Sequence, residues 1–420
     1  MKILPPILTL AALPGLALAE GAPPLALPPG LDSFVATVVA DHAQTATALA
    51  AQAWARAEAS AADQPLYNPD LEFDAAPVAA SPPDTKLSPT FTAAVRLTVD
   101  LGDKRGAKAQ AAAETAQAVT AETRAARSGL AADVLAALAG LEAARQRLAA
   151  ATRQSELAET VLAVATRRQA AGELPAVDFN ATKLAAAEAR RGRDDADLAR
   201  IEAEETLRAT CQCAIETAPA LPVPLPTPPI LTEPAIDALV EERPETEAAR
   251  RRVAAARAAL ALARAQRLPD PTVRLGGSTE GDERRVLIGL SIPLPVRNSG
   301  AAEMVAAGRA LAEAEARERQ TRLDSAAAIR KASRAYRRAV EGDESWRRLA
   351  VPTQQSQSAL LDRLWSIGEI GATDVLVQMR ETARGDLAAI EARAAAWTAY
   401  AALYRAAAPQ PADQGRASDE

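Results

Sequence analysis

The sequence LTVDLGDKRG at residues 97–106 leads straight into an alanine-rich stretch without proline, and LSIPLPVRNSG at residues 290–300 leads into a second alanine-rich stretch. Each long stretch is interrupted by a similar triplet, Gly172-Glu173-Leu174 in the first and Gly368-Glu369-Ile370 in the second. The two triplets are 196 residues apart, and the strand-like segments before them are 193 residues apart. A repeat of this length indicates a duplicated unit made of strands and a helical hairpin.

The composition argues against a wide globular core. Aromatic residues make up 3% of the 420 residues and charged residues 24%, so few large side chains are present to fill such a core. Alanine-rich faces suit helices packed closely along their length. Genomic bias alone could also produce this composition, but the periodic spacing of large apolar residues argues against that. The net charge of −6 gives no reason to expect nucleic acid.

Two hairpins of alternating strands are predicted. Residues 91–101 place Phe91, Val95 and Leu97 on one face and Arg96 on the other. Residues 285–294 repeat the pattern, with Arg285 on the polar face. An apolar face opposite a charged face suits the wall of an outer-membrane barrel, with lipid outside and water inside. A half-buried sheet of a soluble protein gives the same alternation, so the strands alone leave both interpretations open.

Long helices follow the hairpins. Across residues 105–170 large apolar residues recur every three, four or seven positions, which is typical of coiled-coil packing. At 1.5 Å per residue this helix would be roughly 100 Å long. In the second long helix Pro352 is expected to introduce a kink. The other predicted helices cover residues 31–63, 178–209, 236–268, 301–367 and 373–407.

The expected domain organisation follows the repeat. Lys2 and the small-x-small sequence Ala17-Leu18-Ala19 predict a cleavable signal peptide. The predicted segments are the signal peptide at 1–19, an N-terminal extended segment and helix at 20–67, repeat 1 at 68–217 (β-hairpin 68–101, helical hairpin 102–217 with its tip near 172), a Pro-rich linker at 218–234, repeat 2 at 235–407 (helix 235–268, β-hairpin 269–295, helical hairpin 300–407 with its tip near 368) and a disordered tail at 408–420.

The sequence offers no chemistry for an enzyme. It contains no recognisable nucleophile–base–acid set, phosphate loop or metal cluster, so no catalytic, cofactor-binding or metal site is predicted. The single histidine, His42, is expected to lie at the surface or to have its hydrogen bonds satisfied by nearby groups. Cys211 and Cys213 have no distant cysteine to pair with, and their role stays open.

Four strands per chain cannot close a barrel, since about eight is the practical minimum. A sheet with two open edges is not viable in lipid. Three copies would supply twelve strands and form a tube.

At this point the chain resembles the TolC-like outer membrane efflux family, in particular the branch that works with heavy-metal and other resistance-nodulation-division (RND) pumps. Each motif is weak alone, but their order and duplication make the match specific. The motifs are Asn68-Pro69-Asp70-Leu71, Asp100-Leu101-Gly102-Asp103-Lys104-Arg105, Gly172-Glu173-Leu174 with Asp178, Arg243-Pro244-Glu245, Pro269-Asp270-Pro271, Gly289-Leu290-Ser291-Ile292-Pro293-Leu294-Pro295, and Gly368-Glu369-Ile370 with Thr373-Asp374-Val375-Leu376.

The resemblance implies a mostly helical homotrimer. Its twelve-stranded outer-membrane barrel would continue as a long periplasmic helical tunnel. The tunnel would dock on a periplasmic adaptor protein, which in this family branch works with an inner-membrane pump of the RND type. Metal ions or small toxic compounds would pass through without chemistry. The protein would therefore contact outer-membrane lipid and bind no cofactor.

The resemblance also implies roles for individual residues. The two triplets would form the adaptor-docking tips, with Gly172 and Gly368 permitting the reversals. Asp178 and Asp374 begin the returning helices, where the helix dipole alone would stabilise a carboxylate. Alternatively they would narrow the periplasmic entrance as an acidic gate, with arginine partners. The candidate partners are Arg167, Arg168 and Arg363, and the arginines expected to line the lumen are Arg96 and Arg285.

Glu20, and not a cysteine, follows the expected cleavage site, so no lipid anchor is expected. Two other functions remain open from the sequence. The first is the outer-membrane channel of a type I protein secretion system, which would use the same tube. The second is a periplasmic coiled-coil adaptor or scaffold, against which the internal repeat argues.

Overall fold

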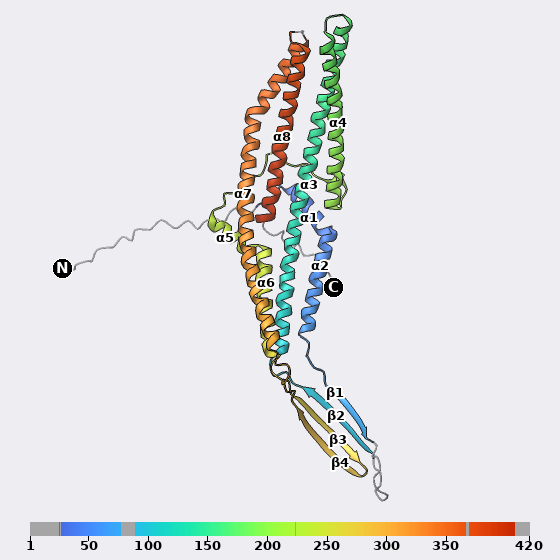
Figure 1. The fold of residues 1–420 in the computed structure, drawn as a ribbon, viewed down its shortest axis with the longest axis vertical. Helices are drawn as coiled ribbons and strands as arrows, with labels where there is room; N and C mark the ends of the chain where they lie inside the picture. The colour runs from blue at the N-terminus through green and yellow to red at the C-terminus, as the bar shows by residue number, and fades with distance from the viewer. Residues whose placement is uncertain (1–24, 26, 77–88, 223, 367–368, 408–420) are drawn as a thin grey trace, which may run out of the picture.

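The computed structural model describes residues 25, 27–76, 89–222, 224–366 and 369–407. Within this part the chain forms an elongated molecule, with long helices along most of its length and a sheet at one end (Figure 1). The signal peptide and the tail expected at 1–19 and 408–420 fall outside the described residues.

The same order of elements occurs twice. The first half contains α1 (Pro29–Asp41), α2 (Ala43–Ala62), β1 (Asp70–Ala76), β2 (Thr90–Thr98), α3 (Lys104–Ala170) and α4 (Ala176–Cys211). After a short 3-10 helix, η1 (Ile215–Thr217), the second half contains α5 (Glu233–Glu242), α6 (Pro244–Ala265), β3 (Thr272–Glu280), β4 (Glu283–Ser291), α7 (Ala301–Ser366) and α8 (Ala372–Ala407). The long helices have 67 and 66 residues, and both returning helices have 36. The expected fold class, mostly helical with a small four-stranded part and an internal duplication, is confirmed.

The single helices expected over 31–63 and 236–268 are wrong, because each is two helices. The backbone is extended at His42 and again at Arg243. His42 caps α2, since its Nδ1 accepts the backbone N–H of Gln44 at 3.0 Å. Arg243 precedes Pro244, which disfavours helical backbone at the residue before it. The repeat therefore includes the helix pair ahead of each hairpin.

The long helix α7 continues through Pro352 from Ala301 to Ser366. The strands are shorter at their ends than the alternation suggested. β2 ends at Thr98, and β4 ends at Ser291, two residues before Pro293. Proline cannot donate a ladder hydrogen bond, which explains the end of β4.

The sheet is antiparallel throughout, in the order β1-β2-β3-β4. Its central pair, β2 and β3, joins the two repeats, with Arg96 opposite Arg274 and Thr98 opposite Thr272. The threonine hydroxyls are 2.8 Å apart and hydrogen-bonded. β1 and β4 are the two edges.

The shorter helices lie end to end in pairs: the end of α4 meets the start of α2, and the end of α8 meets the start of α6. The backbone N–H of Ala43, which begins α2, donates to Gln212 Oε1 at the end of α4 at 3.1 Å. In the second half the guanidinium of Arg243 donates to the Ala406 carbonyl at the end of α8 at 2.6 Å. A cation at a helix C-terminus is favoured by the helix dipole. The part of the molecule near the sheet is therefore built from α2, α3, α6 and α7, and the far part from α3, α4, α7 and α8 (Figure 1).

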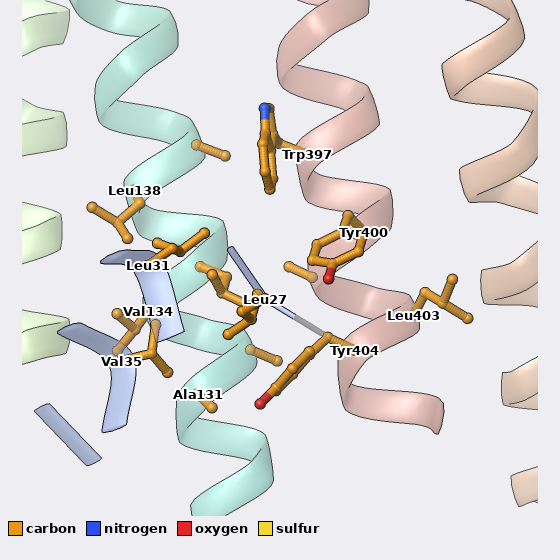
Figure 2. Packing of buried hydrophobic residues seen from close by; sticks show 14 of the residues in the cluster. Leu27, Leu31, Val35, Ala131, Val134, Leu138, Trp397, Tyr400, Leu403 and Tyr404 are labelled. Atoms are coloured by element: carbon orange, nitrogen blue, oxygen red, sulfur yellow. The ribbon is translucent and has the colours of Figure 1, made fainter. Parts of the chain in front are cut away.

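The main core lies at the level where these helix pairs meet. Leu27, just before α1, and Leu31 and Val35 on α1 point toward α3 and α8 (Figure 2). On α8, Trp397 and Tyr400 are fully buried with their rings edge to face at 5.5 Å. Most of the large buried side chains gather here, so this level is where apolar burial holds the two repeats together. None of the described helices combines the length and apolar character that crossing a membrane requires.

Candidate functional site

The two faces of the sheet differ completely in chemistry. The strand register aligns one apolar row across all four strands, formed by Leu71, Val95, Leu275 and Ile288. These side chains are exposed; Ile288 is 80% exposed, and its β1 neighbour on the same face, Phe73, is 74% exposed. Exposed apolar surface of this extent on a regular sheet marks a surface that is covered by something other than water.

The opposite face carries paired charges. Arg96 forms an ion pair with Glu72, and Arg274 contacts Glu72 at 3.1 Å and Asp74 at 3.2 Å. Both candidate lumen residues, Arg96 and Arg285, lie on this face. Arg285 contacts Glu280 at 2.8 Å and Glu283 at 2.7 Å. This face therefore needs water or polar contact, whereas the apolar face does not.

A buried polar cluster connects the sheet to the helices. Lys104, at the start of α3, forms an ion pair with Asp270 at 2.6 Å and also donates to the Leu268 carbonyl at 2.7 Å. The Tyr67 hydroxyl donates to Asp270 Oδ2 at 2.6 Å. Asp270 and Lys104 are both buried. The cluster ties together the residues before β1, after β2 and before β3.

Electrostatics stabilise this cluster. The hydrogen bond to Asp270 is the main reason that the pKa of Tyr67 rises to about 12. Burial acts to raise the pKa of Asp270, but the hydrogen bonds from Lys104 and Tyr67 outweigh it, so this pKa is lowered. Asp270 is therefore ionised at neutral pH, and its carboxylate is held by Lys104, Tyr67 and the backbone N–H of Leu101, which donates at 3.4 Å.

The turn between β2 and α3 is also defined by carboxylates. Asp100 accepts the backbone N–H groups of Gly102 at 3.1 Å and Arg105 at 3.0 Å. Asp103 adopts left-handed backbone with φ 52° and caps α3 by accepting from Gly106. A Cβ at Gly102 would come within 2.8 Å of the Ala265 carbonyl oxygen on α6. The turn thus requires glycine at 102 because α6 passes so close.

The first tip is a tight reversal between α3 and α4. Gly172 has φ +77°, a conformation that favours glycine. The backbone N–H of Glu173 donates to the Arg168 carbonyl at 2.9 Å, which is the closing bond of a Schellman motif. Glu173 is exposed, whereas Leu174 is half-buried.

The second tip repeats this pattern in the residues that the structure describes. Gly368 lies outside them. The backbone N–H of Glu369 donates to the Leu364 carbonyl at 3.0 Å, the same five-residue bond as at the first tip. Glu369 is exposed and Ile370 is half-buried. At both tips, the acid points outward and the apolar residue points inward.

Leu174 and Ile370 pack against a small second core, here called the tip core. Both belong to its rim of half-buried side chains. Its buried members come from α3, α4 and α8, and they are Ala158, Val161, Ala186, Ala189, Val375, Leu376 and Met379. The tip core therefore connects the two helical hairpins near the tips.

The candidate gate residues sit close to the tips. Asp178 and Asp374 are each the third residue of a returning helix, within its first turn. Asp178 is half-buried and Asp374 exposed, and the Asp374 carboxylate lies near Gly371 at the helix start. Arg167 is exposed and its Nε donates to the Ala163 carbonyl of its own helix at 3.4 Å. Arg363 is exposed near the end of α7.

The hairpins are also connected by ion pairs. Arg380 on α8 contacts Glu188 on α4 at 3.0 Å. Beside this pair a cavity of about 920 Å³ is lined mainly by α3, α4 and α8, with Val351 of α7. Arg153 and Asp386 face each other across it at 4.0 Å. Near the tips, the two helical hairpins are thus joined by exposed ion pairs and by the side chains of the tip core, without the large aromatic residues of the main core.

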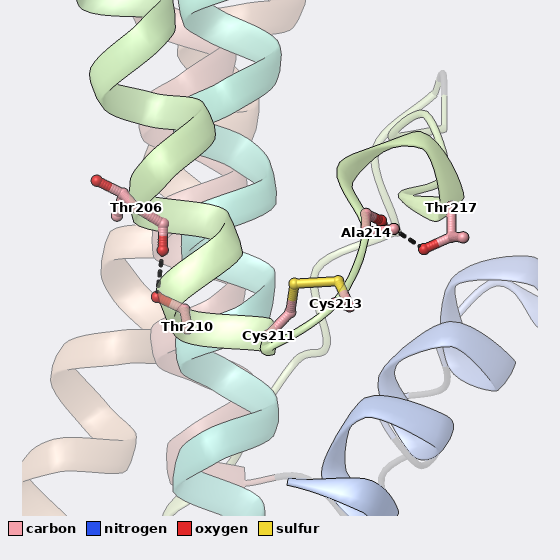
Figure 3. Close-up of a disulfide and its surroundings, with 6 residues drawn as sticks. All are labelled: Thr206, Thr210, Cys211, Cys213, Ala214 and Thr217. Carbon is pink, nitrogen blue, oxygen red and sulfur yellow. Dashed lines mark hydrogen bonds between the residues drawn. A yellow bond between two sulfur atoms is a disulfide. The ribbon is translucent and has the colours of Figure 1, made fainter.

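Cys211 and Cys213 form a disulfide at the end of α4 (Figure 3). Between them Gln212 takes a left-handed conformation with φ 53° and ends the helix. The same Gln212 accepts the N–H that begins α2. The disulfide therefore fixes the joint between α4 and α2. The role of the two cysteines stayed open from the sequence, because neither has a distant cysteine to pair with.

The Tyr67–Asp270–Lys104 cluster was also not predicted as a unit. All three residues lay in or beside the motifs noted in the sequence, but their contact requires the pairing of β2 with β3. Across the described residues, no group of three or more His, Cys, Asp or Glu side chains is placed to hold a metal ion.

Comparisons with known proteins agree with this arrangement. The family model described as outer membrane efflux protein matches residues 36–211. The cobalt-zinc-cadmium resistance protein CzcC of Cupriavidus metallidurans is 28% identical over 232 residues, which are 52% of this chain and 53% of CzcC. The chain thus spans about half the length of the curated relative that it matches.

Solved structures match over most of the chain. A membrane protein from Pseudomonas aeruginosa has a TM-score of 0.76 at 21% identity, covering 93% of this chain and 92% of its own. CusC, solved in a study of folding and transmembrane channel formation, has a TM-score of 0.74 at 15% identity, covering 94% and 99%. The outer membrane protein VceC from Vibrio cholerae has a TM-score of 0.72 at 19% identity, covering 90% and 95%.

The resemblance to the TolC-like outer membrane efflux family is confirmed. The matching family model is that of outer membrane efflux proteins, and CusC is described as forming a transmembrane channel. The family model begins within α1 and runs to the end of α4, which is most of the first repeat of this chain. The second repeat has the same element order and completes the fold.

Proposed function

We propose that this protein is the outer-membrane exit duct of a tripartite efflux system. It would conduct substrates passively from the periplasm to the exterior. One observation carries the proposal: a four-stranded sheet with an exposed apolar face and a charged face continues directly into helices of 67 and 66 residues. Lipid suits the apolar face and water the charged one, as in an outer-membrane barrel.

The open edges of the sheet support a trimer. β1 and β4 each have an unpaired edge in a single chain, and unpaired backbone groups are not tolerated in lipid. Three copies would give twelve strands in a closed barrel, with the helices continuing as a tunnel into the periplasm. Arg96 and Arg285 would then line the lumen, where their acidic neighbours neutralise part of their charge.

The tips would meet the periplasmic adaptor. Glu173 and Glu369 are exposed, and Leu174 and Ile370 anchor the reversals to the tip core. Asp178 and Asp374, with Arg167 and Arg363 nearby in sequence or across the tip, would narrow the entrance. The inner-membrane pump would be of the RND type. Export would use the cleavable signal peptide.

The similarity to CzcC, named for cobalt, zinc and cadmium resistance, favours metal ions over other small toxic compounds as cargo. Selection among ions would fall to the pump.

The test combines location with resistance. The full-length protein should fractionate with the outer membrane and elute from a sizing column in detergent as a trimer. A deletion strain should become sensitive to cobalt, zinc or cadmium, and the intact gene should restore resistance. Recovery as a soluble periplasmic monomer would refute the duct. A deletion that abolished export of a protein, and left metal resistance intact, would point to a secretion channel instead.

A further inference from the structure

In the four strands that the structure describes, the apolar face of the sheet carries a single charged side chain, at the end farthest from the helices. We propose that this side chain, Arg284, binds the phosphate of a lipid headgroup in the outer leaflet of the outer membrane. Thr279 on the neighbouring strand would be a second donor to the same phosphate. The inference rests on the proposed outer-membrane duct and adds to it a binding site for one class of lipid.

The strand register places Arg284 on the apolar face. Ile288, four residues further along β4, belongs to the apolar row, and side chains an even number of residues apart on a strand lie on the same face. Arg284 pairs with Thr279, and Thr279 pairs with Phe91 on β2. These three side chains form the last row of this face before the turn between β3 and β4. The turn lies at the end of the sheet away from the helices (Figure 1), which in the proposed duct faces the cell exterior.

The length of the strand places this row at the level of the headgroups. β4 has nine residues, which at about 3.4 Å each and a tilt of about 40° cover roughly 20 Å of height. The apolar band of an outer-membrane barrel is about 25 Å tall and has aromatic side chains at its margins. Arg284 and Phe91 therefore lie at the outer margin of the band. An arginine facing lipid costs little there and much more at the midplane.

The guanidinium of Arg284 has its charge available for a ligand. The next residue, Arg285, lies on the opposite face and contacts Glu280 at 2.8 Å and Glu283 at 2.7 Å. Arg284 is exposed and forms no ion pair with any residue that the structure describes. The two glutamates beside the turn thus neutralise the arginine on the lumen side. The charge on the lipid side is left for an anion that the chain itself does not supply.

A phosphorylated lipid is the anion that this row of side chains suits. The planar guanidinium of arginine donates to two phosphate oxygens at once. Facing residues on paired strands have Cβ atoms about 4.5–5.5 Å apart, so the Thr279 hydroxyl can donate to a third oxygen. Phe91 in the same row, and Val286 two residues deeper, are exposed apolar side chains that would contact the acyl chains. Free phosphate would use the donors but not this apolar surface.

Binding of lipid A to the detergent-extracted full-length trimer tests the site. Lipid A with two phosphate groups should give adducts of up to three lipids per trimer in native mass spectrometry. Arg284→Gln should lower the affinity about tenfold and Thr279→Val about threefold. Arg285→Gln is the matched control, because it removes the adjacent arginine on the opposite face, and it should bind lipid as the wild type does. Lipid A freed of its phosphate groups should bind weakly, and equally to the wild type and Arg284→Gln.

Several results would overturn the site while the proposed duct stands. They are a wild-type trimer without lipid adducts, an Arg284→Gln trimer that binds as the wild type does, an Arg285→Gln trimer that loses as much affinity, and phosphate-free lipid that binds as well as the phosphorylated form. Lower SDS resistance of the Arg284→Gln trimer with unchanged lipid binding would instead assign the arginine to a contact between copies. A protein recovered outside the outer membrane, with no trimer, would overturn both the site and the duct.

Discussion

At the scale of single residues, the buried carboxylate of Asp270 is expected to matter most for stability. Its carboxylate lies between Lys104 and Tyr67 where the sheet meets the helices. Breaking a buried ion pair leaves an uncompensated charge, while replacing both members with apolar residues does not. Lys104→Met should therefore destabilise the protein by about 3 kcal/mol. The double variant Lys104→Met/Asp270→Leu should be more stable than Lys104→Met, as measured by thermal unfolding of the detergent-extracted protein. A double variant less stable than the single would contradict this account.

The same carboxylate predicts a pH dependence. The pKa of Asp270 is lowered in the folded protein. The stability it contributes is therefore present above the unfolded value of about 3.9, and it is lost as pH falls through the lower folded value. The difference in melting temperature between the wild type and Asp270→Asn should be constant near neutrality and should shrink below about pH 4. A difference that grew with acidity would mean that the pKa of Asp270 is raised, and not lowered, in the folded protein.

At the scale of elements, the junction of β2 and β3 depends on one glycine. A Cβ at Gly276 would lie 2.4 Å from the Ala93 carbonyl oxygen and 2.6 Å from the Ala94 Cβ, whereas one at Gly277 would meet nothing closer than 3.5 Å. Gly276→Ala should therefore disrupt the pairing of the repeats, and Gly277→Ala should be tolerated. The yield of SDS-resistant oligomer from outer membranes measures both. Equal yields from the two variants would show that the strands can shift to accept the extra methyl group.

Helices and strands were predictable from the sequence where the periodic spacing of apolar residues ran over many residues without a break. The residues of α3 and β2 repeat one pattern over many turns or pleats, so their identity and faces followed directly. The breaks at His42 and Arg243 were missed because both lie within runs of otherwise helical residues, and a single extended residue leaves little trace in a periodic pattern. Pro244 was the available signal, since the residue before a proline avoids helical backbone. The contact of Tyr67 with Asp270 was out of reach because it depends on which strands pair, and the hairpins alone do not determine that.

At the scale of the whole molecule, the two cores differ in the size of their side chains. The main core contains the fully buried aromatic residues Tyr336, Trp397 and Tyr400, whereas the tip core contains mainly alanine and medium-sized side chains. If the periplasmic end of a duct widens, α8 must move away from α3 and α4 near the tips while the main core stays intact. The contacts that such a movement breaks include the tip core and the ion pairs of Arg380 with Glu188 and of Arg153 with Asp386.

Weakening the tip core should therefore make the duct leaky without unfolding it. Leu376 is buried in the tip core and Leu403 in the main core. Leu376→Ala removes contacts between the hairpins and should raise single-channel conductance in planar bilayers, and it should sensitise cells to vancomycin, which an intact outer membrane excludes. Leu403→Ala, with the same change in side chain, should lower the melting temperature, because a buried leucine-to-alanine change in a closely packed core costs about 2–5 kcal/mol. It should leave the conductance of the surviving trimers unchanged. Leu376→Ala could instead lower the melting temperature as much as Leu403→Ala and leave the conductance at its wild-type value. The tip core would then belong to the fixed part of the structure, and the duct would have to open by another movement.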